Sequence, residues 1–525
     1  MCTIVFLCNA LCDSNLTLKC KKNALHYAAV SGGTRPPEHK PLTEEEIMTI
    51  KPDFEELRRK LIPQVGPPTY PGGNKRQPTL NQQFFARLAK EVFNPIYEKI
   101  EELFYIYWAE YGLWEPQDTP TMLERISLLM MRYANETGDT FVNGKRDVGT
   151  IHNILNFMKA DACCGQENAF VRNGETFIHC GNGMILFPLQ PDGRRRPVLK
   201  PFDPKYMSRN RTEYLYSEDA RCDDFISRLL KPALSEDDIS LLQQYVAQCL
   251  LGVNDSQTFL LLIGTAGGGK STLVNIIEKL IKRKNCTELR LEHMNSRFET
   301  QRLLGKTLLT AKDVPSNFLN TAGAHKLKAL TGKDTVTIEH KGSNVATDLC
   351  CAFNAIITAT NTLRVSIDGD AEAWRRRLIL ISYNNPPPKE KIPNFDDVLL
   401  AKEGDGILRW AVEGAVLLLE NGGKIIKSDI QKHKVDNLLH ESDALSEFIA
   451  TCLELDPQGT VTTAELLEAF REFCEKRGWQ LLPQRFIENR LPEYIYQAFG
   501  LSKRTDIRRA GHNNRGYYGL RLKND

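Results

Sequence analysis

The chain has 525 residues, which suggests about three or four domains at typical domain sizes. With 42% hydrophobic and 26% charged residues, its composition is that of a folded soluble protein and excludes a disordered or membrane-embedded chain. The net charge of +2 excludes nucleic-acid binding through bulk charge, so any such binding requires local basic patches. The first eight residues lack a basic region, so we expect no signal peptide and no membrane partner.

The fourteen cysteines have no disulfide-scaffold spacing, which indicates reduced thiols and a cytoplasmic location. Two clusters combine cysteines with a histidine, but neither has the paired C-x-x-C spacing of a zinc ribbon. Zinc is therefore the less favoured interpretation of both clusters, which are Cys8, Cys12, Cys20 and His26, and Cys163, Cys164, Cys180 and His179.

Residues 1–80 are poorly patterned apart from a short helix expected around Glu44 to Leu61, and they predict no function. Residues 81–255 are predicted to form a mostly helical N-terminal or collar domain with a small β element. Apolar residues recur at helical spacing between Phe84 and Leu103, so helix is expected over 80–160. A hairpin is expected at 175–187, followed by two amphipathic helices that break near Pro232.

The stretch from Thr258 to Leu280 predicts a strand, a glycine-rich turn and a helix, which is the context of a P-loop. Such a turn points backbone N–H groups at an anion, and the helix N-terminus adds positive potential. Lys270 would reach the β- and γ-phosphates, and the Ser271 hydroxyl would bind Mg²⁺. The chain is therefore predicted to bind a nucleoside triphosphate through Gly264, Thr265, Ala266, Gly267, Gly268, Gly269, Lys270, Ser271 and Thr272.

Strands and helices continue to alternate after this helix, which predicts a parallel sheet covered by helices. Further strands are expected at 288–293, 307–311, 353–358 and 377–382. Asp313 follows one of them, where a carboxylate can hold the Mg²⁺ shell and orient the attacking water. Asn361 follows the next strand, where an amide can position that water against the γ-phosphate.

Two basic segments accompany these strands. A hairpin that carries Lys333, His340 and Lys341 can contact a phosphate backbone, although an exposed charged hairpin without a ligand is the alternative. The segment 370–377 places three arginines before a strand. Arg375 and Arg376 are candidates for the cation that a neighbouring subunit delivers to the γ-phosphate, and a solvated cluster is the alternative.

Residues 440–525 predict the order helix, short strand, helix, helix and basic hairpin. Thr462 and Glu465 have the spacing of a capping box, which marks the start of a helix. The third helix and the hairpin carry basic residues that are candidates for DNA contacts: Arg485, Arg490, Lys503, Arg504, Arg508 and Arg509.

The motif set resembles superfamily 3 helicases, specifically the phage- and plasmid-borne primase-helicase family that includes the poxvirus-type enzymes. The resemblance covers about residues 170–525 and rests on the P-loop, Leu304–Asp313, Lys328–Thr337, Ala359–Asn361 and Ala373–Ile381. The chain departs from the family in two places. Asp313 is followed by Val314 where an acidic pair is common, and Gly268-Gly269 replaces the usual asparagine of the P-loop.

The resemblance implies an α/β AAA+-like ATPase domain in residues 256–425 and a winged helix in residues 440–525. It further implies an ATP-dependent, ring-forming DNA helicase that initiates replication of a phage, plasmid or mobile element. ATP and Mg²⁺ would lie between the subunits of a homo-oligomer, expected to be a hexamer. Single-stranded DNA would occupy the channel, and the winged helix would bind duplex or origin DNA, with a small protein-docking domain as the alternative.

Two further hypotheses stay open. A primase in the N-terminal region would need paired acids on strands, but the only such spacing before the P-loop is Asp53-Phe-Glu55, inside a helical pattern. We therefore expect the primase to be absent or supplied by a separate primase or polymerase. The other hypothesis is a DNA-binding scaffold that uses ATP only to assemble and does not unwind DNA.

Overall fold

The computed structural model divides into two compact units. The first contains the residues up to Arg221 with Leu280–Asn285 and Gly404–Val412, and the second contains Cys222–Lys279, Cys286–Glu403 and Glu413–Asp525. Among the residues described, no helix is both long and apolar enough to cross a membrane. The structure describes residues 52–72, 77–161, 165–166, 169–170, 175–294, 296, 299–315, 318, 322–339, 346–350, 352–360, 371–383, 392–476, 484–509 and 511–523.

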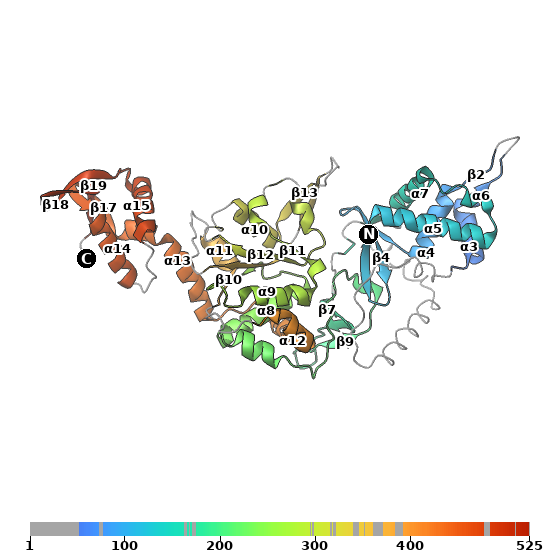
Figure 1. Cartoon of the computed structure of the whole chain (residues 1–525), viewed down its shortest axis with the longest axis horizontal. Helices are drawn as coiled ribbons and strands as arrows, with labels where there is room; N and C mark the ends of the chain where they lie inside the picture. Colours follow the sequence, from blue (N-terminus) through green and yellow to red (C-terminus); the bar gives the residue numbers. More distant parts are fainter. Residues whose placement is uncertain are drawn as a thin grey trace. The chain divides into compact units, whose positions relative to one another are not determined.

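The first unit packs helices against a four-stranded sheet of order β5-β4-β3-β6 (Figure 1). Its core includes Phe84, Phe85 and Tyr133, whose rings meet edge to face. The helices are α3 (Phe54–Val65), α4 (Gln82–Phe93), α5 (Thr119–Thr137), α6 (Thr140–Asn143) and α7 (Val148–Ala160). The strands are β1 (Thr69–Tyr70), β2 (Thr79–Leu80), β3 (Ile96–Glu98), β4 (Leu103–Trp108), β5 (Leu113–Gln117) and β6 (Gly165–Gln166).

The helix predicted over 80–160 is wrong for residues 96–117, which form β3, β4 and β5. Helix α4 ends at Asn94, which adopts a left-handed conformation with φ 43°, and Pro95 cannot continue the helix. The following Leu103–Trp108 is rich in aromatic and β-branched side chains, which favour strands. The apolar residues near Ile96 and Ile100 therefore continued the helical spacing by coincidence.

Two other predictions in this part of the chain are confirmed. The hairpin is present as β7 (Phe177–Cys180) and β8 (Gly183–Leu186), which pair antiparallel and continue to β9 (Val198–Lys200) and the short helix η1 (Pro204–Tyr206). Asp53 caps α3 by accepting the N–H groups of Glu55 and Glu56, so the only D-x-E spacing before the P-loop starts a helix. The predicted helix around residue 44 lies outside the described residues.

The second unit is built on a parallel sheet of order β11-β12-β15-β10-β16. These strands are β10 (Phe259–Ile263), β11 (Cys286–Glu288), β12 (Leu308–Val314), β15 (Asn354–Ala359) and β16 (Leu378–Ser382). The strand predicted over 288–293 is wrong beyond Glu288, because the chain turns into the short helix η4 (Leu291–His293). The fold class predicted from the sequence is confirmed by this sheet, the helical N-terminal part and a C-terminal antiparallel sheet.

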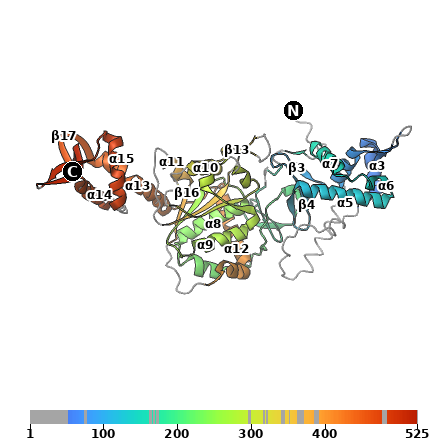
Figure 2. The same ribbon diagram turned by 45° about the horizontal axis from the view of Figure 1, so that its top comes forward.

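Helices cover both faces of this sheet. Figures 1 and 2 show α8 and α9 on one face and α10 and α11 on the other. The helices are η2 (Phe225–Leu230, π-helical), α8 (Glu236–Leu251), α9 (Lys270–Ile281), η3 (Arg283–Asn285), η5 (Thr300–Leu303), α10 (Ala322–Thr331), α11 (Ala371–Arg377) and α12 (Phe395–Glu420). The predicted break near Pro232 separates η2 from α8. Strands β13 (Thr335–Glu339) and β14 (Ala346–Cys350) form the predicted hairpin after α10.

Buried hydrogen bonds fix the P-loop strand against its neighbours. The Tyr245 hydroxyl of α8 donates to the carbonyl of Ala355 on β15, at 2.7 Å. The Asn254 amide donates to the carbonyls of Thr258 and Phe353, each at 2.8 Å, and so ties the start of β10 to the start of β15. Satisfied buried polar groups of this kind define a single register.

The C-terminal module follows the predicted order of elements. Helix α13 (Asp429–Cys452) leads to β17 (Leu453–Thr462), α14 (Thr463–Lys476), α15 (Gln484–Phe499), β18 (Arg504–Arg509) and β19 (His512–Leu522). The strands form an antiparallel sheet of order β17-β19-β18. The capping box is confirmed, since Glu465 Oε2 accepts the Thr462 N–H at 2.8 Å and the Glu465 N–H donates to Thr462 Oγ1 at 3.2 Å.

Candidate functional site

The glycine-rich turn connects β10 to α9 and lies against the end of β16. The Tyr383 N–H donates to the Ile263 carbonyl at 2.6 Å, and a Cβ at Gly264 would lie 2.1 Å from the Tyr383 carbonyl oxygen. Only glycine allows this approach. Gly267 and Gly269 have φ of 80° and 106°, in the region that favours glycine. The turn is therefore held by its glycines in a conformation that other residues resist.

Lys270 lies on this turn, with 6% of its surface exposed. Its ammonium donates to the carbonyls of Gly264 and Thr265, each at 2.8 Å. Burial lowers the pKa of Lys270, and the negative charge of Asp313 acts in the opposite direction. Ser271 is exposed in the first turn of α9, where backbone N–H groups have no partner within the helix. An anion could therefore be bound by the helix terminus, by the turn and by Lys270.

Asp313 lies on β12 at a β-bulge between Ala311 and Val314. Its side chain is exposed, and its backbone has φ of 52°. The Asp313 N–H donates to the Thr358 hydroxyl of β15 at 2.8 Å, which fixes this left-handed residue. The negative charge of Asp313 is the one that opposes the lowering of the Lys270 pKa. That the two residues act in one site stays a prediction.

Four side chains that the sequence analysis missed hold β12 against α9. The buried Glu278 carboxylate accepts hydrogen bonds from the Thr310 hydroxyl at 2.7 Å and from the Lys312 ammonium at 3.0 Å. Lys312 also donates to Asn275 Oδ1 at 2.8 Å. A buried acid among apolar residues of the P-loop helix was a signal for such a partner, because a buried carboxylate needs compensation.

The two candidate arginines of helix α11 have different surroundings. Arg375 donates from Nε to Asp436 of α13 at 2.6 Å and also pairs with Glu372. Both acids raise the pKa of the Arg375 guanidinium. Arg376 is exposed and has no ion-pair partner among the described residues. Of the two, Arg376 is therefore the better candidate for a contact with a neighbouring subunit.

The predicted DNA hairpin is only partly described. Lys333 at its base has φ of 63° and forms an exposed ion pair with Asp255 at 2.6 Å. The Gln257 amide donates to the Gly332 carbonyl at 2.9 Å and holds the same base. His340, Lys341 and the predicted catalytic Asn361 lie outside the described residues.

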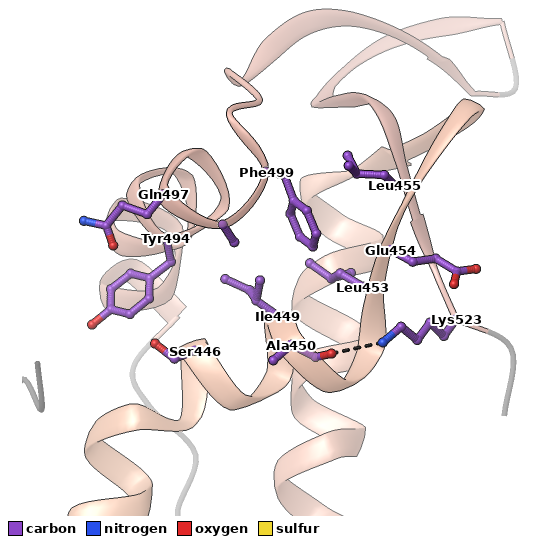
Figure 3. Close-up of a pocket in the computed structure, with 11 residues that line it drawn as sticks. Ser446, Ile449, Ala450, Leu453, Glu454, Leu455, Tyr494, Gln497, Phe499 and Lys523 are labelled. Carbon is purple, nitrogen blue, oxygen red and sulfur yellow. Dashed lines mark hydrogen bonds between the residues drawn. The ribbon is translucent and has the colours of Figure 1, made fainter. Parts of the chain in front are cut away.

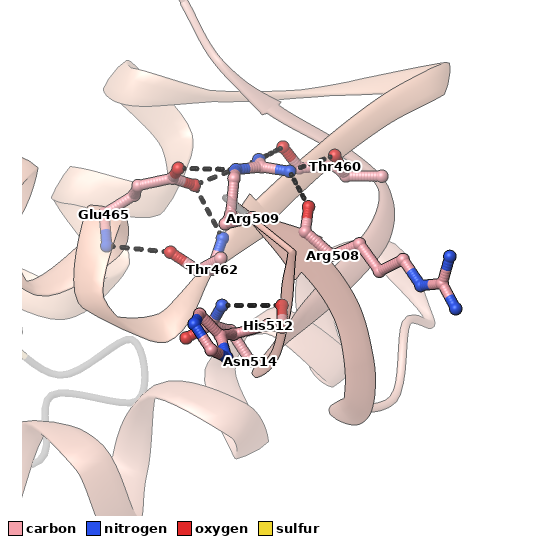
Figure 4. Close-up of polar contacts among 7 residues, drawn as sticks. All are labelled: Thr460, Thr462, Glu465, Arg508, Arg509, His512 and Asn514. Atoms are coloured by element: carbon pink, nitrogen blue, oxygen red, sulfur yellow. Dashed lines mark hydrogen bonds and ion pairs between the residues drawn. The ribbon is translucent and has the colours of Figure 1, made fainter.

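The basic residues of the C-terminal module divide into two groups. The Arg509 guanidinium donates to Glu465 Oε1 at 2.8 Å and to the Thr460 carbonyl at 2.7 Å, so it stabilises the capping box (Figure 4). Arg504 pairs with Asp506, and Arg490 pairs with Glu493. Figure 4 shows the Arg508 guanidinium pointing away from the Arg509 cluster. Arg485 and Arg508 are exposed and Lys503 is half-buried, none of them with an ion-pair partner among the described residues.

An apolar groove of about 570 Å³ lies on the same module, between the ends of α13 and α15 and the first residues of β17 (Figure 3). Phe499 and Tyr494 line it from α15, and Leu453 and Leu455 line it from β17. Leu455 is 59% exposed. None of the basic residues predicted to contact DNA lines the groove. The ammonium of Lys523, which does line it, donates to the Ala450 carbonyl at 3.0 Å.

The second cysteine and histidine cluster offers little to a metal where the structure describes it. Both ring nitrogens of His179 are engaged, Nδ1 with Ser208 Oγ at 2.8 Å and Nε2 with the Tyr111 carbonyl at 2.9 Å. Burial raises the pKa of the Cys180 thiol to about 11, which disfavours the thiolate that zinc requires. Cys163, Cys164 and the first cluster lie outside the described residues.

Comparison with known proteins gives one sequence family and a set of solved structures. A family of unknown function (DUF5906) matches residues 262–377, from the end of β10 through α11. The apo structure of the NrS-1 C terminal region is 11% identical, with a TM-score of 0.41, covering 83% of this chain and 99% of that chain. An A form apo structure of the same NrS-1 region is 12% identical, with a TM-score of 0.39, covering 81% and 96%.

Proposed function

We propose that this protein is an ATP-dependent, ring-forming DNA helicase that acts as a replication initiator of a phage, plasmid or other mobile element. The observation that carries the proposal is the position of Lys270 on the glycine-rich turn after β10 and of Asp313 near the end of β12, two parallel strands that β15 separates in the sheet. A turn at the N-terminus of a helix, in which Gly264 leaves no room for a Cβ and Gly267 and Gly269 have positive φ, has the construction of a triphosphate site.

The residues fit ATP with Mg²⁺. The turn from Gly264 to Gly269 would surround the phosphates with N–H groups, and Lys270 would exchange its two carbonyl partners for phosphate oxygens. The exposed Ser271 hydroxyl and the Asp313 carboxylate would hold the metal, which neutralises the charge that develops on the phosphates. Asp313 would also orient the attacking water, with Asn361 as its predicted partner.

The remaining residues give the site a shared character. Arg376 is exposed and has no ion pair with any residue that the structure describes, so it is suited to reach the γ-phosphate bound by a neighbouring copy. A site shared between neighbouring copies is compatible with a closed ring, and we propose a hexamer. Single-stranded DNA would contact the hairpin around Lys333, His340 and Lys341, and duplex DNA would contact Arg485, Lys503 and Arg508 of the C-terminal module. A separate primase or polymerase would copy the unwound strand.

The first experiment measures ATP hydrolysis with and without single-stranded DNA. The wild type is compared with Lys270→Ala, with Arg376→Ala, and with Arg471→Ala as a control whose arginine pairs only with the exposed Glu468 among the described residues. We expect DNA to stimulate the wild type and the control. Loss of one charge-stabilising contact should lower turnover by about 10²–10³-fold in each of the other variants.

Mixing Lys270→Ala with Arg376→Ala should restore part of the activity, because mixed rings contain some sites with both residues intact. Turnover that is absent or indifferent to single-stranded DNA would contradict the motor. A strand-displacement assay then tests unwinding directly.

The second candidate is the ATP-assembled scaffold, which the single carboxylate at Asp313 favours, since Val314 follows where a second acid is common. In this case ATP should still bind and promote oligomerisation, and Lys270→Ala should block assembly. Hydrolysis by the intact protein would be negligible with or without DNA.

A further inference from the structure

Helix α11 contacts several parts of the second unit within four residues. The Trp374 ring packs edge-on against Phe259 of β10, with centroids 6.1 Å apart, and the Lys328 ammonium of α10 lies 4.6 Å from the centroid of the same ring. Arg377 reaches the base of the β13–β14 hairpin, since a Cβ on Gly332 would lie 3.0 Å from Arg377 Nη2. The position of α11 is therefore tied to the P-loop strand and to the hairpin.

Arg375 ties the same helix to α13. Its Nε atom donates to Asp436 Oδ1 at 2.6 Å, and the two side chains are 38% and 32% exposed. An ion pair exposed to this degree is weak, so it can break and reform without unfolding the surrounding structure. The bond holds Arg375 within its own chain and leaves the adjacent Arg376 exposed.

Helix α13 contributes to two hydrophobic cores. Val435, Leu438 and Leu439, which flank Asp436, pack in the core that also contains Trp374 and Leu378. Leu445, Phe448 and Ile449, further along the same helix, pack in the core of the C-terminal module. Helix α13 is therefore the element through which a movement of the module would reach Asp436.

We propose that Asp436 is a positioning residue that couples the C-terminal module to the arginine helix. When duplex DNA binds the module, α13 shifts, the Asp436–Arg375 bond changes, and α11 presents Arg376 differently to the neighbouring subunit. Duplex DNA at a distant surface would in this way change the rate of ATP hydrolysis. The inference rests on the proposed ATPase function and adds to it a regulatory input that enters through α13.

The test measures the ATP turnover of the full chain with and without a saturating random-sequence duplex. For the wild type we expect the duplex to raise kcat by about fivefold, a typical allosteric coupling. Asp436→Asn keeps the shape of the side chain but weakens its bond to the guanidinium, so the ratio of kcat with and without duplex should fall to about one. Asp436→Glu should restore part of the ratio.

The matched control is Asp429→Asn, which makes the same substitution in the first turn of α13, where Asp429 pairs with the exposed Lys432. This variant should keep the wild-type ratio. Arg375→Gln should behave like Asp436→Asn, and the double variant should be no worse than either single one. The duplex affinity and the melting temperature of Asp436→Asn should match those of the control, since a general structural defect would change both.

Three results would count against the inference in distinguishable ways. A wild type that hydrolyses ATP but gives no response to duplex overturns the coupling and leaves the ATPase intact. A response of Asp436→Asn equal to that of the wild type overturns the role of this residue. A wild type without any hydrolysis overturns the proposed function itself.

Discussion

The P-loop and the basic hairpin of the C-terminal module are both assigned to phosphate groups, but the protein builds them differently. The proposed phosphate contacts of the P-loop come from its backbone, because glycines at 264, 267 and 269 determine its conformation and Lys270 donates to the carbonyls of the turn itself. The proposed phosphate contacts of the hairpin come from its side chains, and some of those side chains are bound by other residues of the module. Arg509 is bound by Glu465 and Thr460, whereas its neighbour Arg508 extends away from that cluster.

The difference shows what decides whether a residue is free for a ligand. Between Lys503 and Lys523 there are seven lysines and arginines and one aspartate, a strongly basic stretch. Fixed partners within the module occupy several of these cations, so the charge of the stretch overstates the surface available to DNA. In the P-loop, in contrast, the internal hydrogen bonds of Lys270 involve carbonyls that a phosphate can replace.

The largest effect is expected from Gly264→Ala, which tests whether the backbone carries the P-loop. The new Cβ would lie 2.1 Å from the Tyr383 carbonyl oxygen, so the strand end or the turn must move. We expect the free energy of unfolding to fall by about 1–3 kcal/mol or more, as in overpacked cores, together with loss of ATP binding. Urea unfolding and fluorescence titration with an ATP analogue would measure both.

Gly144→Ala provides the control for this prediction. Its φ is −73°, and a Cβ there meets nothing closer than 3.6 Å, so its stability should change by no more than about 0.5 kcal/mol. A Gly264→Ala protein that binds the ATP analogue normally would contradict the backbone account of the loop.

A smaller effect is expected when the adjacent Arg508 and Arg509 of the hairpin are replaced one at a time. The two variants compare an arginine proposed to bind DNA with one that stabilises the fold, within the same strand. Arg509→Ala removes the hydrogen bonds to Glu465 and Thr460 and should lower the free energy of unfolding by about 1 kcal/mol. Arg508→Ala should leave stability unchanged, weaken duplex binding, and reduce the salt dependence of binding by about one counterion. Chemical unfolding and salt-dependent anisotropy of labelled DNA would distinguish the two variants.

Leu455→Ser in the apolar groove serves as the control for DNA binding, because none of the arginines of β18 lines the groove. It should leave duplex affinity unchanged. The assignment of Arg508 to DNA and Arg509 to the fold would be wrong if Arg509→Ala weakened DNA binding while its stability stayed at the wild-type level.

The sequence predicted those parts of the fold that local rules determine. The P-loop between β10 and α9, the hairpin at Gly181-Asn182 and the capping box of Thr462 and Glu465 each depend on neighbours within a few residues, and the structure contains all three. The error at residues 96–117 has a local cause too. Pro95 signalled the end of a helix, but the apolar spacing continued beyond it.

The parts that the sequence did not predict depend on contacts between distant residues. Arg375 and Arg376 are adjacent basic residues in the sequence, and the ion pair of Arg375 with Asp436 depends on a different helix, α13. Glu278 and Thr358 lie beside the site because α9, β12 and β15 pack together, which no spacing along the chain indicates. Arg509 was assigned to DNA for the same reason, since its partner Glu465 belongs to a different element.

The smallest effect concerns Lys427, a half-buried lysine whose ammonium donates to the Leu378 carbonyl at 2.9 Å. Burial lowers the pKa of Lys427 to about 8, from 10.5 in an exposed lysine. Between these two values the unfolded chain binds more protons than the folded chain, so the contribution of Lys427 makes stability rise with pH. Below about pH 8 both states are protonated, and the folded protein bears the full cost of the buried charge.

Lys427→Met should therefore gain most in stability over the wild type near pH 7, and this difference should shrink as the pH rises from about 8 to about 10. Urea unfolding of both proteins across this range measures the change in the difference, which is independent of any constant effect of the lost hydrogen bond. Lys432→Met is the control, because Lys432 is exposed beside Asp429 and should show no such trend. A constant difference between Lys427→Met and the wild type would show that Lys427 is protonated equally in both states. Burial of the Lys427 charge would then not contribute to the pH dependence of stability.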